Sequence, residues 1–450
     1  MHIRLLAVAA LLAATPLAAA DGPETGVSEA RLKADVERLV AFGTRHTLSD
    51  QVSKTRGIGA ARRWGEAEFR KTAKACRGCL TIVLPERMVT GNRVPQPTRL
   101  VNVVAIQLGT ERPNEVVIVQ GHIDSRVTDV MNFTSDAPGA NDDGSGTALV
   151  LEAARVLSKT KYPVTIVYAL LSGEEQGLHG GQLLADYASE RGWQVNAVLN
   201  NDIVGNSCGS DGYCEPGHVR VFSEGPRADL DAKLRADQRR FAGENDSPSR
   251  NLSRWLETID DAALQVRPIW RADRMGRGGD HLPFLDKGYP AIRFSVAVED
   301  YEHQHQDVRT ENGVVYGDTV DAMDFAYLAK VTALNVRALD RLARAPLAPA
   351  PTAEAAVQTF TTVMWAEVPG AATYSIWQRR TDAAGWGDIP VIAQVVATSA
   401  KLDGVRGDDW IFGVSACSAD GVCSPVASAV PAGAFVPVPK APSDAKGDKK

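Results

Sequence analysis

The spacing of apolar residues along the chain predicts helices in some segments and strands in others, and the two kinds of element alternate. Residues 29–75 carry apolar side chains at helical spacing, and the same spacing returns at 147–157 and 321–342. Short continuous apolar runs predict strands at residues 101–108, 116–121, 164–171, 197–204 and 291–298. Strands that alternate with helices predict an α/β fold with a mostly parallel central sheet sandwiched by helices. We place this domain at residues 21–345.

The pattern changes after residue 345. Residues 346–355 are rich in Pro and Ala and predict an extended linker. From 356 to 435 the helical spacing disappears, and short apolar runs between turn residues predict a small C-terminal all-β sandwich. These runs cover residues 357–364, 372–378, 391–396 and 410–417. Residues 436–450 are rich in Pro, Lys and Asp and are expected to be disordered.

Residues 1–20 predict a secretory signal peptide. Arg4 precedes an Ala- and Leu-rich run that ends at Leu17, and Ala18-Ala19-Ala20 offers a small-residue cleavage site. The alternative is a short membrane anchor, but the run is shorter than the roughly 20 residues that cross a bilayer. We therefore expect a secreted or periplasmic protein with no membrane span.

The cysteines agree with export, because all six fall into close pairs. The pairs are Cys76/Cys79, Cys208/Cys214 and Cys417/Cys423. In an oxidising compartment such spacing predicts local disulfides. Cys76 and Cys79 could instead form half of a zinc ribbon or a redox site, but a ribbon needs a second pair nearby.

Composition narrows the functional classes only moderately. The chain has 450 residues, a net charge of −6, 44% hydrophobic and 23% charged residues, which is typical of a globular protein of about two domains. A mildly acidic chain has no electrostatic reason to bind nucleic acid. The sequence does not determine the oligomeric state.

Ionisable side chains gather just past the predicted strands. In chain order they are His122, Asp124, Asp142, Glu174, Glu175, Asp202, His303 and His305. Most of them follow or end a predicted strand, while Asp142 lies in a Gly-rich segment before a predicted helix. The carboxyl edge of an open α/β sheet is where ligands bind. We therefore expect these side chains to share one site.

Histidines and carboxylates at one sheet edge suit zinc or a similar divalent cation. The available ligands are His122, Asp142, Glu175, Asp202 and His305. They exceed the three protein ligands of a single catalytic zinc, so they favour two metals that share a bridging carboxylate. Asp124 can fix the tautomer of the His122 imidazole, and Glu174 is left free to act as a base.

The segments that carry these residues resemble the co-catalytic di-zinc aminopeptidases typified by secreted bacterial leucine aminopeptidases. The matching motifs, over about residues 100–310, are Gly-His122-Ile-Asp-Ser, Gly-Ala-Asn-Asp142-Asp-Gly-Ser-Gly, Gly-Glu174-Glu175-Gln-Gly-Leu, Asn-Asn-Asp202, Gly-Asp280-His281-Leu-Pro-Phe and Gln-His305. Residues 356–435 resemble a fibronectin type III domain through Trp365, Tyr374-Ser-Ile-Trp377 and the run from Trp410 to Cys417.

The first resemblance implies a zinc metallo-aminopeptidase with two Zn²⁺ per chain, acting on peptides or proteins with a free N-terminus. The substrate would be hydrolysed by a metal-bridged water with Glu174 as general base. Asp142 would bridge the metals, and its peptide bond to Asp143 would be cis. The resemblance further pairs His122 with Asp202 on one metal, and Glu175 with a late histidine on the other.

Several alternatives stay open at this stage. His303 competes with His305 as the last ligand, and a role for Tyr301 in stabilising an oxyanion is in doubt. The same scaffold hosts metallo-carboxypeptidases, for which an arginine clamp could come from Arg271, Arg274 and Arg277. It also hosts single-zinc glutaminyl cyclases, and a non-catalytic binding protein is a further alternative. His46 and His218 lie outside the motifs and are expected at the surface.

Overall fold

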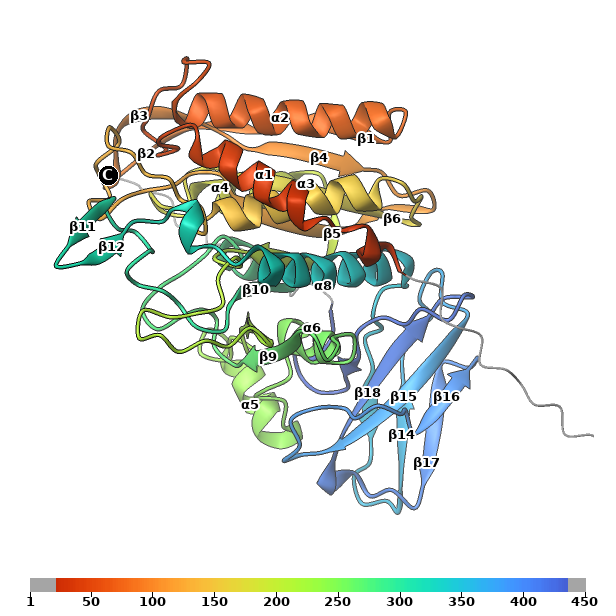
Figure 1. Cartoon of the computed structure of the whole chain (residues 1–450). Coiled ribbons are helices and arrows are strands. Elements are labelled where there is room, and N and C mark those ends of the chain that lie inside the picture. Colours follow the sequence, from red (N-terminus) through yellow and green to blue (C-terminus); the bar gives the residue numbers. More distant parts are fainter. Residues whose placement is uncertain (1–21, 436–450) are drawn as a thin grey trace, which may run out of the picture.

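The computed structural model describes residues 22–435, so the predicted signal peptide and the predicted disordered tail lie outside the described residues. An eight-stranded sheet forms the centre of the larger part of the molecule (Figure 1). Its strands, in spatial order, are β1 (Leu80–Val83), β4 (Val103–Gln107), β6 (Val164–Leu171), β5 (Arg112–His122), β7 (Gln194–Asn201), β10 (Ala291–Val296), β8 (His218–Ser223) and β9 (Gln265–Ile269).

The four central strands β6, β5, β7 and β10 are parallel to one another, and β8 is parallel to β9. Antiparallel pairs occur at β1–β4, β4–β6 and β10–β8. The prediction of a mostly parallel sheet is therefore confirmed, with antiparallel strands toward both edges. Because the central strands run the same way, their carboxyl ends meet at one edge of the sheet.

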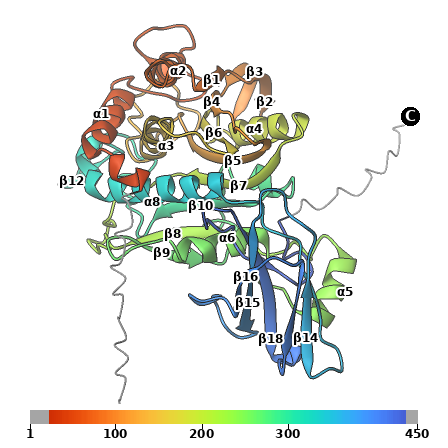
Figure 2. The same cartoon turned by 90° about the vertical axis from the view of Figure 1, so that its right-hand side faces the viewer.

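Helices cover both faces of this sheet. One face carries α1 (Glu29–Val40), α2 (Gly57–Ala75), α3 (Gly144–Leu157), α6 (Pro248–Glu257) and α8 (Phe325–Arg344). The other carries α4 (His179–Glu190) and α7 (Leu282–Leu285), and Figure 2 shows α3 and α4 on opposite sides. Alternate side chains of β5 enter the two cores, Val117 and Val119 in one, Val116 and Ile118 in the other. Burial on both faces explains the continuous apolar runs of the sequence.

Two predicted helix starts differ from the structure by a few residues. Helix α3 begins at Gly144 because Asp143 caps it, accepting the amide of Gly146. Helix α8 begins at Phe325, where the Asp324 side chain accepts the amide of Tyr327, and a short 3₁₀ turn occupies Val320–Ala322. Residues 29–75, where the sequence shows helical spacing, form the two helices α1 and α2 separated by a loop.

Smaller elements surround the sheet. They are η1 (Pro23–Gly26), the hairpins β2 (Glu86–Gly91) with β3 (Val94–Val101) and β11 (Arg309–Glu311) with β12 (Val314–Tyr316), and helix α5 (Ala232–Phe241). Among the described residues, the helices are all too short or too polar to traverse a lipid bilayer. The three predicted disulfides, Cys76–Cys79, Cys208–Cys214 and Cys417–Cys423, are confirmed.

The C-terminal part is an all-β sandwich, as predicted, and lies below the large sheet in Figure 2. One sheet holds β13 (Thr352–Glu354), β14 (Phe360–Met364) and β17 (Ser399–Asp403). The other holds β16 (Ile392–Val395), β15 (Thr373–Arg380), β18 (Trp410–Cys417) and β19 (Ala427–Ser428), and the 3₁₀ turn η3 (Gly407–Asp409) precedes β18. The Pro/Ala segment 346–355 leads into this sandwich and already contains β13.

The sandwich packs directly on the larger part. Asp246, in the loop before α6, forms an ion pair of 2.6 Å with Arg379 on β15. Asn251 on α6 donates a hydrogen bond of 2.9 Å to Ser428 on β19. Ala427 belongs to the same buried cluster as the side chains of α1, α3 and α8. The two parts therefore share both apolar and polar contacts.

A glycine at the start of α3 provides a test of how closely this helix packs on the central sheet. A Cβ on Gly146 would overlap the main-chain oxygen of Asn201 and the carboxylate of Asp143, which is held in place by the amides of His122 and Gly146. We expect Gly146→Ala to lower the free energy of unfolding by about 1–3 kcal/mol. Gly217→Ala is the matched control, because a Cβ there meets nothing within 4 Å. Urea unfolding of both variants measures the difference, and equal stabilities would contradict the overlap.

Candidate metal centre

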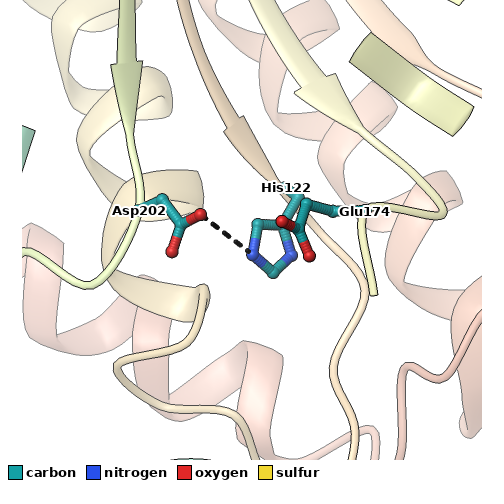
Figure 3. Close-up of side chains that lie close together, drawn as sticks. All are labelled: His122, Glu174 and Asp202. Atoms are coloured by element: carbon teal, nitrogen blue, oxygen red, sulfur yellow. Dashed lines mark ion pairs between the residues drawn. The ribbon is translucent and has the colours of Figure 1, made fainter. Parts of the chain in front are cut away.

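The sequence-predicted site residues come together at the carboxyl edge of the central strands. His122 ends β5, Glu174 and Glu175 follow β6, and Asp202 follows β7. Figure 3 shows His122, Glu174 and Asp202 directed toward a common point from three neighbouring strands. The edge of the sheet thus gathers side chains that are far apart in the sequence.

These three residues form the first group. One nitrogen of His122 and one carboxylate oxygen each of Glu174 and Asp202 all lie within 4.8 Å of one another. The Nε2 atom of His122 is 3.8 Å from Oδ2 of Asp202 (Figure 3).

The second group consists of Asp142, Glu175 and His305, again with one donor atom each within 4.8 Å. The Nε2 atom of His305 lies 2.8 Å from Oδ2 of Asp142 and 3.1 Å from Oε1 of Glu175. The other oxygen of Asp142, Oδ1, lies 3.1 Å from Nε2 of His122. The carboxylate of Asp142 therefore lies between the groups and directs one oxygen to each.

The donor atoms are arranged as a metal would require. Nε2 of His122 and Oε1 of Glu175 are buried and have no hydrogen-bond partner among the described residues. Buried polar atoms are nearly always satisfied, so unpaired atoms at one place need an explanation. Imidazole nitrogens and carboxylate oxygens are zinc ligands. The residues present therefore fit a zinc centre.

The main chain holds the His122 ring. Its Nδ1–H donates to the carbonyl oxygen of Asp124 at 3.2 Å, which leaves the Nε2 lone pair directed toward Asp142. The carboxylate of Asp124 lies farther away, 3.7 Å from the same nitrogen. The nearer contact that fixes the tautomer is thus the carbonyl group of Asp124, whereas the sequence interpretation used its side chain.

The carboxylate of Asp124 instead organises the loop that carries the glutamates. It accepts the amides of Gly173, Glu174 and Glu175 at 2.9, 3.3 and 3.2 Å. Burial alone would raise the pKa of this carboxyl, but His122 and the amide hydrogen bonds lower it below its ordinary value. Asp124 therefore stays ionised and sets where Glu174 and Glu175 lie.

Glu174 occupies a different electrostatic environment from Asp124. Burial raises its pKa well above the ordinary value, and the carboxylates of Glu175 and Asp202 add to the effect against the opposing influence of His122. A partly buried carboxyl with a raised pKa beside candidate ligands is typical of a proton-transferring group.

Several supporting residues were not identified from the sequence. Arg293, wholly buried on β10, lies 2.7 Å from Asp202 and 3.2 Å from Asp273. Asp318 accepts the amides of Asn141 and Asp142 at 2.8 and 2.7 Å and so holds the bridging carboxylate from its main chain. The position of Arg293 within an apolar strand is the one sequence signal that would have indicated a nearby carboxylate, because a buried charge is nearly always paired.

The structure separates the two late histidines. His303 lies 2.6 Å from Asp300 and belongs to neither group of candidate ligands, whereas His305 belongs to the second group. Tyr301 is 63% exposed. The peptide bond between Asp142 and Asp143 is cis, as the family resemblance implies.

The prediction of a surface position for His46 is wrong. His46 is fully buried, and its ring donates to the carbonyl oxygen of Val130 at 2.8 Å while accepting the amide of Leu48 at 3.0 Å. Burial lowers the pKa of His46. The ring thus acts as a structural link between two loops, which no local sequence pattern indicated.

Comparison with known proteins gives the chain its family. Residues 102–325 match the family described as Peptidase family M28. A protein of Leptosphaeria maculans named "Probable zinc metalloprotease" is 42% identical over 89% of this chain and 94% of its own length. A protein of Pyricularia oryzae with the same description is 41% identical over 90% of this chain and 83% of its own length. Among solved structures, the LapA aminopeptidase of Legionella pneumophila aligns with a TM-score of 0.49 and 19% identity over 71% of this chain and 72% of that chain. With a relative this similar along almost the whole of both sequences, the chain belongs to peptidase family M28.

Proposed function

We propose that the protein is a zinc-dependent aminopeptidase with two Zn²⁺ per chain, which removes N-terminal residues from peptides or proteins. The observation that carries the proposal is the pair of ligand groups joined by the carboxylate of Asp142, with Glu174 beside them. The names of the fungal relatives, which specify a zinc metalloprotease, support the choice of metal.

Each zinc ion would be held by three side chains, one of which is shared. His122, Asp142 and Asp202 would hold the first ion, and Asp142, Glu175 and His305 the second. Bound zinc would polarise the scissile carbonyl and lower the pKa of a water molecule at the site. In this assignment Asp142 completes the first set, so Glu174 is not needed as a ligand.

Glu174 would then carry the proton. Its carboxylate takes a proton from the attacking water and passes it to the leaving amine, which is the work of a general base followed by a general acid. The amide of Glu174 is held by Asp124 at 3.3 Å, so the orientation of this side chain depends on the same buried carboxylate that faces His122. Arg126, 3.0 Å from Glu175, would keep that candidate ligand in place.

We also propose that the protein is exported, to the cell exterior or the periplasm. The three disulfides support this, because such bonds persist in oxidising compartments. The division into a peptidase domain at 21–345 and a fibronectin type III-like domain at 356–435 belongs to the same proposal.

A metallo-carboxypeptidase is the second candidate. Arg274 and Arg277 line the cleft beside the ligand groups and offer positive charge for the carboxylate at the end of a peptide. A carboxypeptidase acts on a peptide whose N-terminus is blocked, whereas an aminopeptidase does not.

The test follows the hydrolysis of one leucine-initiated pentapeptide that is either free or acetylated at its N-terminus. We expect cleavage of the free peptide only, loss of activity with a zinc chelator, and recovery on addition of zinc. Elemental analysis should find two zinc ions per chain. Cleavage of the acetylated peptide from its carboxyl end would transfer the assignment to the second candidate, and one zinc per chain would contradict the shared role of Asp142.

A further inference from the structure

A cleft of about 320 Å³ opens beside the two ligand groups, and its lining is unusually rich in arginine. Residues from both groups form one part of it, including Asp142, Glu174 and Asp202. The arginines that line it are Arg93, Arg126, Arg274 and Arg277. Arg274 and Arg277 share the loop between β9 and α7, whereas Arg93 and Arg126 come from two other segments, so no single helix or hairpin accounts for their meeting. Of the four, only Arg126 forms an ion pair with a candidate zinc ligand, Glu175.

The charges of the other arginines are only partly compensated. Arg93, in the β2–β3 hairpin, donates to the main-chain oxygen of Glu175 at 3.0 Å and forms no ion pair with any described carboxylate. Arg277 pairs with Glu299 at 2.6 Å, and Arg220 pairs with the same carboxylate at 2.8 Å. The carboxylate of Glu299 thus pairs with more than one arginine. The carboxylates inside the cleft are the proposed zinc ligands and the proposed general base.

Arg274 supplies a second, independent observation. Its side chain is only 8% exposed, and its Nη1 group is buried without a hydrogen-bond partner among the described residues. Its Nε atom pairs with Oδ1 of Asp273 at 3.0 Å, whereas the contact of Nη1 with Oε2 of Glu299 is 3.6 Å long, too far for a hydrogen bond. A buried donor left unpaired costs free energy that an acceptor entering the cleft would recover.

The geometry points to a substrate with a carboxylate next to the scissile bond. Guanidinium groups bind carboxylates through two parallel N–H···O bonds, which makes arginine the residue suited to this recognition. The cleft volume lies at the small end of the range for ligand pockets, so it admits only the substrate residues that directly flank the scissile bond. The carboxylate that Arg93 and Arg277 would bind therefore belongs to one of these residues. The inference rests on the proposed function and specifies its substrate class.

This carboxylate has two chemical sources, an acidic side chain or the free end of a short peptide. Three pairs of peptides separate them, each differing only in one charge: Asp-Leu-NH₂ against Asn-Leu-NH₂, Leu-Asp-Leu-NH₂ against Leu-Asn-Leu-NH₂, and Leu-Gly against Leu-Gly-NH₂. We expect the wild-type protein to prefer the charged member of at least one pair by about ten- to a hundredfold in kcat/KM, the range of a charge-assisted hydrogen bond.

The same pairs are then measured on three variants. Arg93→Gln and Arg277→Gln remove charge at partly exposed positions, so they test the cleft without disturbing the buried Arg274. We expect either variant to reduce the preference about tenfold, with most of the loss in kcat/KM falling on the charged member of the pair. Arg99→Gln, on the same hairpin as Arg93 but paired with Glu86, is the control and should keep the preference.

The outcomes separate this inference from the proposed function. Cleavage of charged and neutral peptides at equal rates in all three pairs would overturn the inference and leave the aminopeptidase assignment standing. A preference that survives in both cleft variants would also overturn it. If no free peptide is cleaved by the zinc-loaded protein, here or in the acetylation test, the proposed function fails and the inference fails with it.

Discussion

Glu174→Gln is expected to lower kcat by about two to four orders of magnitude, the contribution of a positioned general base. Glutamine has nearly the same shape as glutamate but cannot accept a proton from water. The carboxylates and imidazoles that would hold zinc are untouched, because Asp142 supplies the third side chain of each set. Elemental analysis should therefore still find two zinc ions in the inactive variant. Kinetics of the zinc-loaded protein on a leucine-initiated peptide measure the effect.

The control for this variant is Glu190→Gln, at the exposed end of α4. It makes the same chemical change away from the site and should keep wild-type kcat and zinc content. A Glu174→Gln protein that loses zinc would show that Glu174 is a ligand, as its membership of the first group permits. A variant with two zinc ions and near-normal turnover would show that another group transfers the proton.

Asp246→Ala is expected to lower the free energy of unfolding by about 3–5 kcal/mol, the cost of removing one partner from a buried ion pair. Asp246 is 1% exposed and receives both of its close bonds to Arg379 from one guanidinium nitrogen, at 2.6 and 2.7 Å. Ser428 donates a further hydrogen bond of 2.6 Å. Alanine would leave the buried charge of Arg379 without its partner at the contact between the two parts of the molecule. Chemical unfolding followed by tryptophan fluorescence measures the loss.

Two further variants show whether the buried pair is the cause. Asp246→Leu combined with Arg379→Met removes both charges and should be more stable than Asp246→Ala, since the charge of Arg379 no longer stays buried without its close partner. Asp420→Ala breaks an exposed ion pair with Arg344, which also joins the sandwich to α8, and should cost less than about 1 kcal/mol. Equal losses for Asp246→Ala and Asp420→Ala would contradict the argument from burial.

The sequence predicted the central elements better than the outer ones, and burial explains the difference. Strand β6 has the predicted bounds because every residue of Val164–Leu171 is buried, which forces an uninterrupted apolar run. Strands β8 and β9 were not predicted. Strand β8 alternates polar and apolar residues only from His218 to Val221, and Pro268 interrupts β9, so each strand presents a pattern of only a few residues.

The candidate site divides in the same way. His122, Glu174 and Asp202 were found because each follows an apolar strand, and the direction of parallel strands then brings them together. The hydrogen bonds that the amides of Asn141 and Asp142 donate to Asp318 join segments that are more than 170 residues apart, so no local pattern contains them. The same is true of Arg293, whose pairing with Asp202 depends on two strands becoming neighbours.

The shared core has a consequence for the order in which the protein is made. Ala427 and Phe435 lie near the end of the described chain, yet they are buried with side chains from the first helices and from α8. A ribosome releases the N-terminal layers first, so these layers leave the exit tunnel with part of their apolar surface uncovered. The peptidase fold can cover that surface only after residues 427–435 have emerged, so a nascent chain exposes it for as long as those residues are missing.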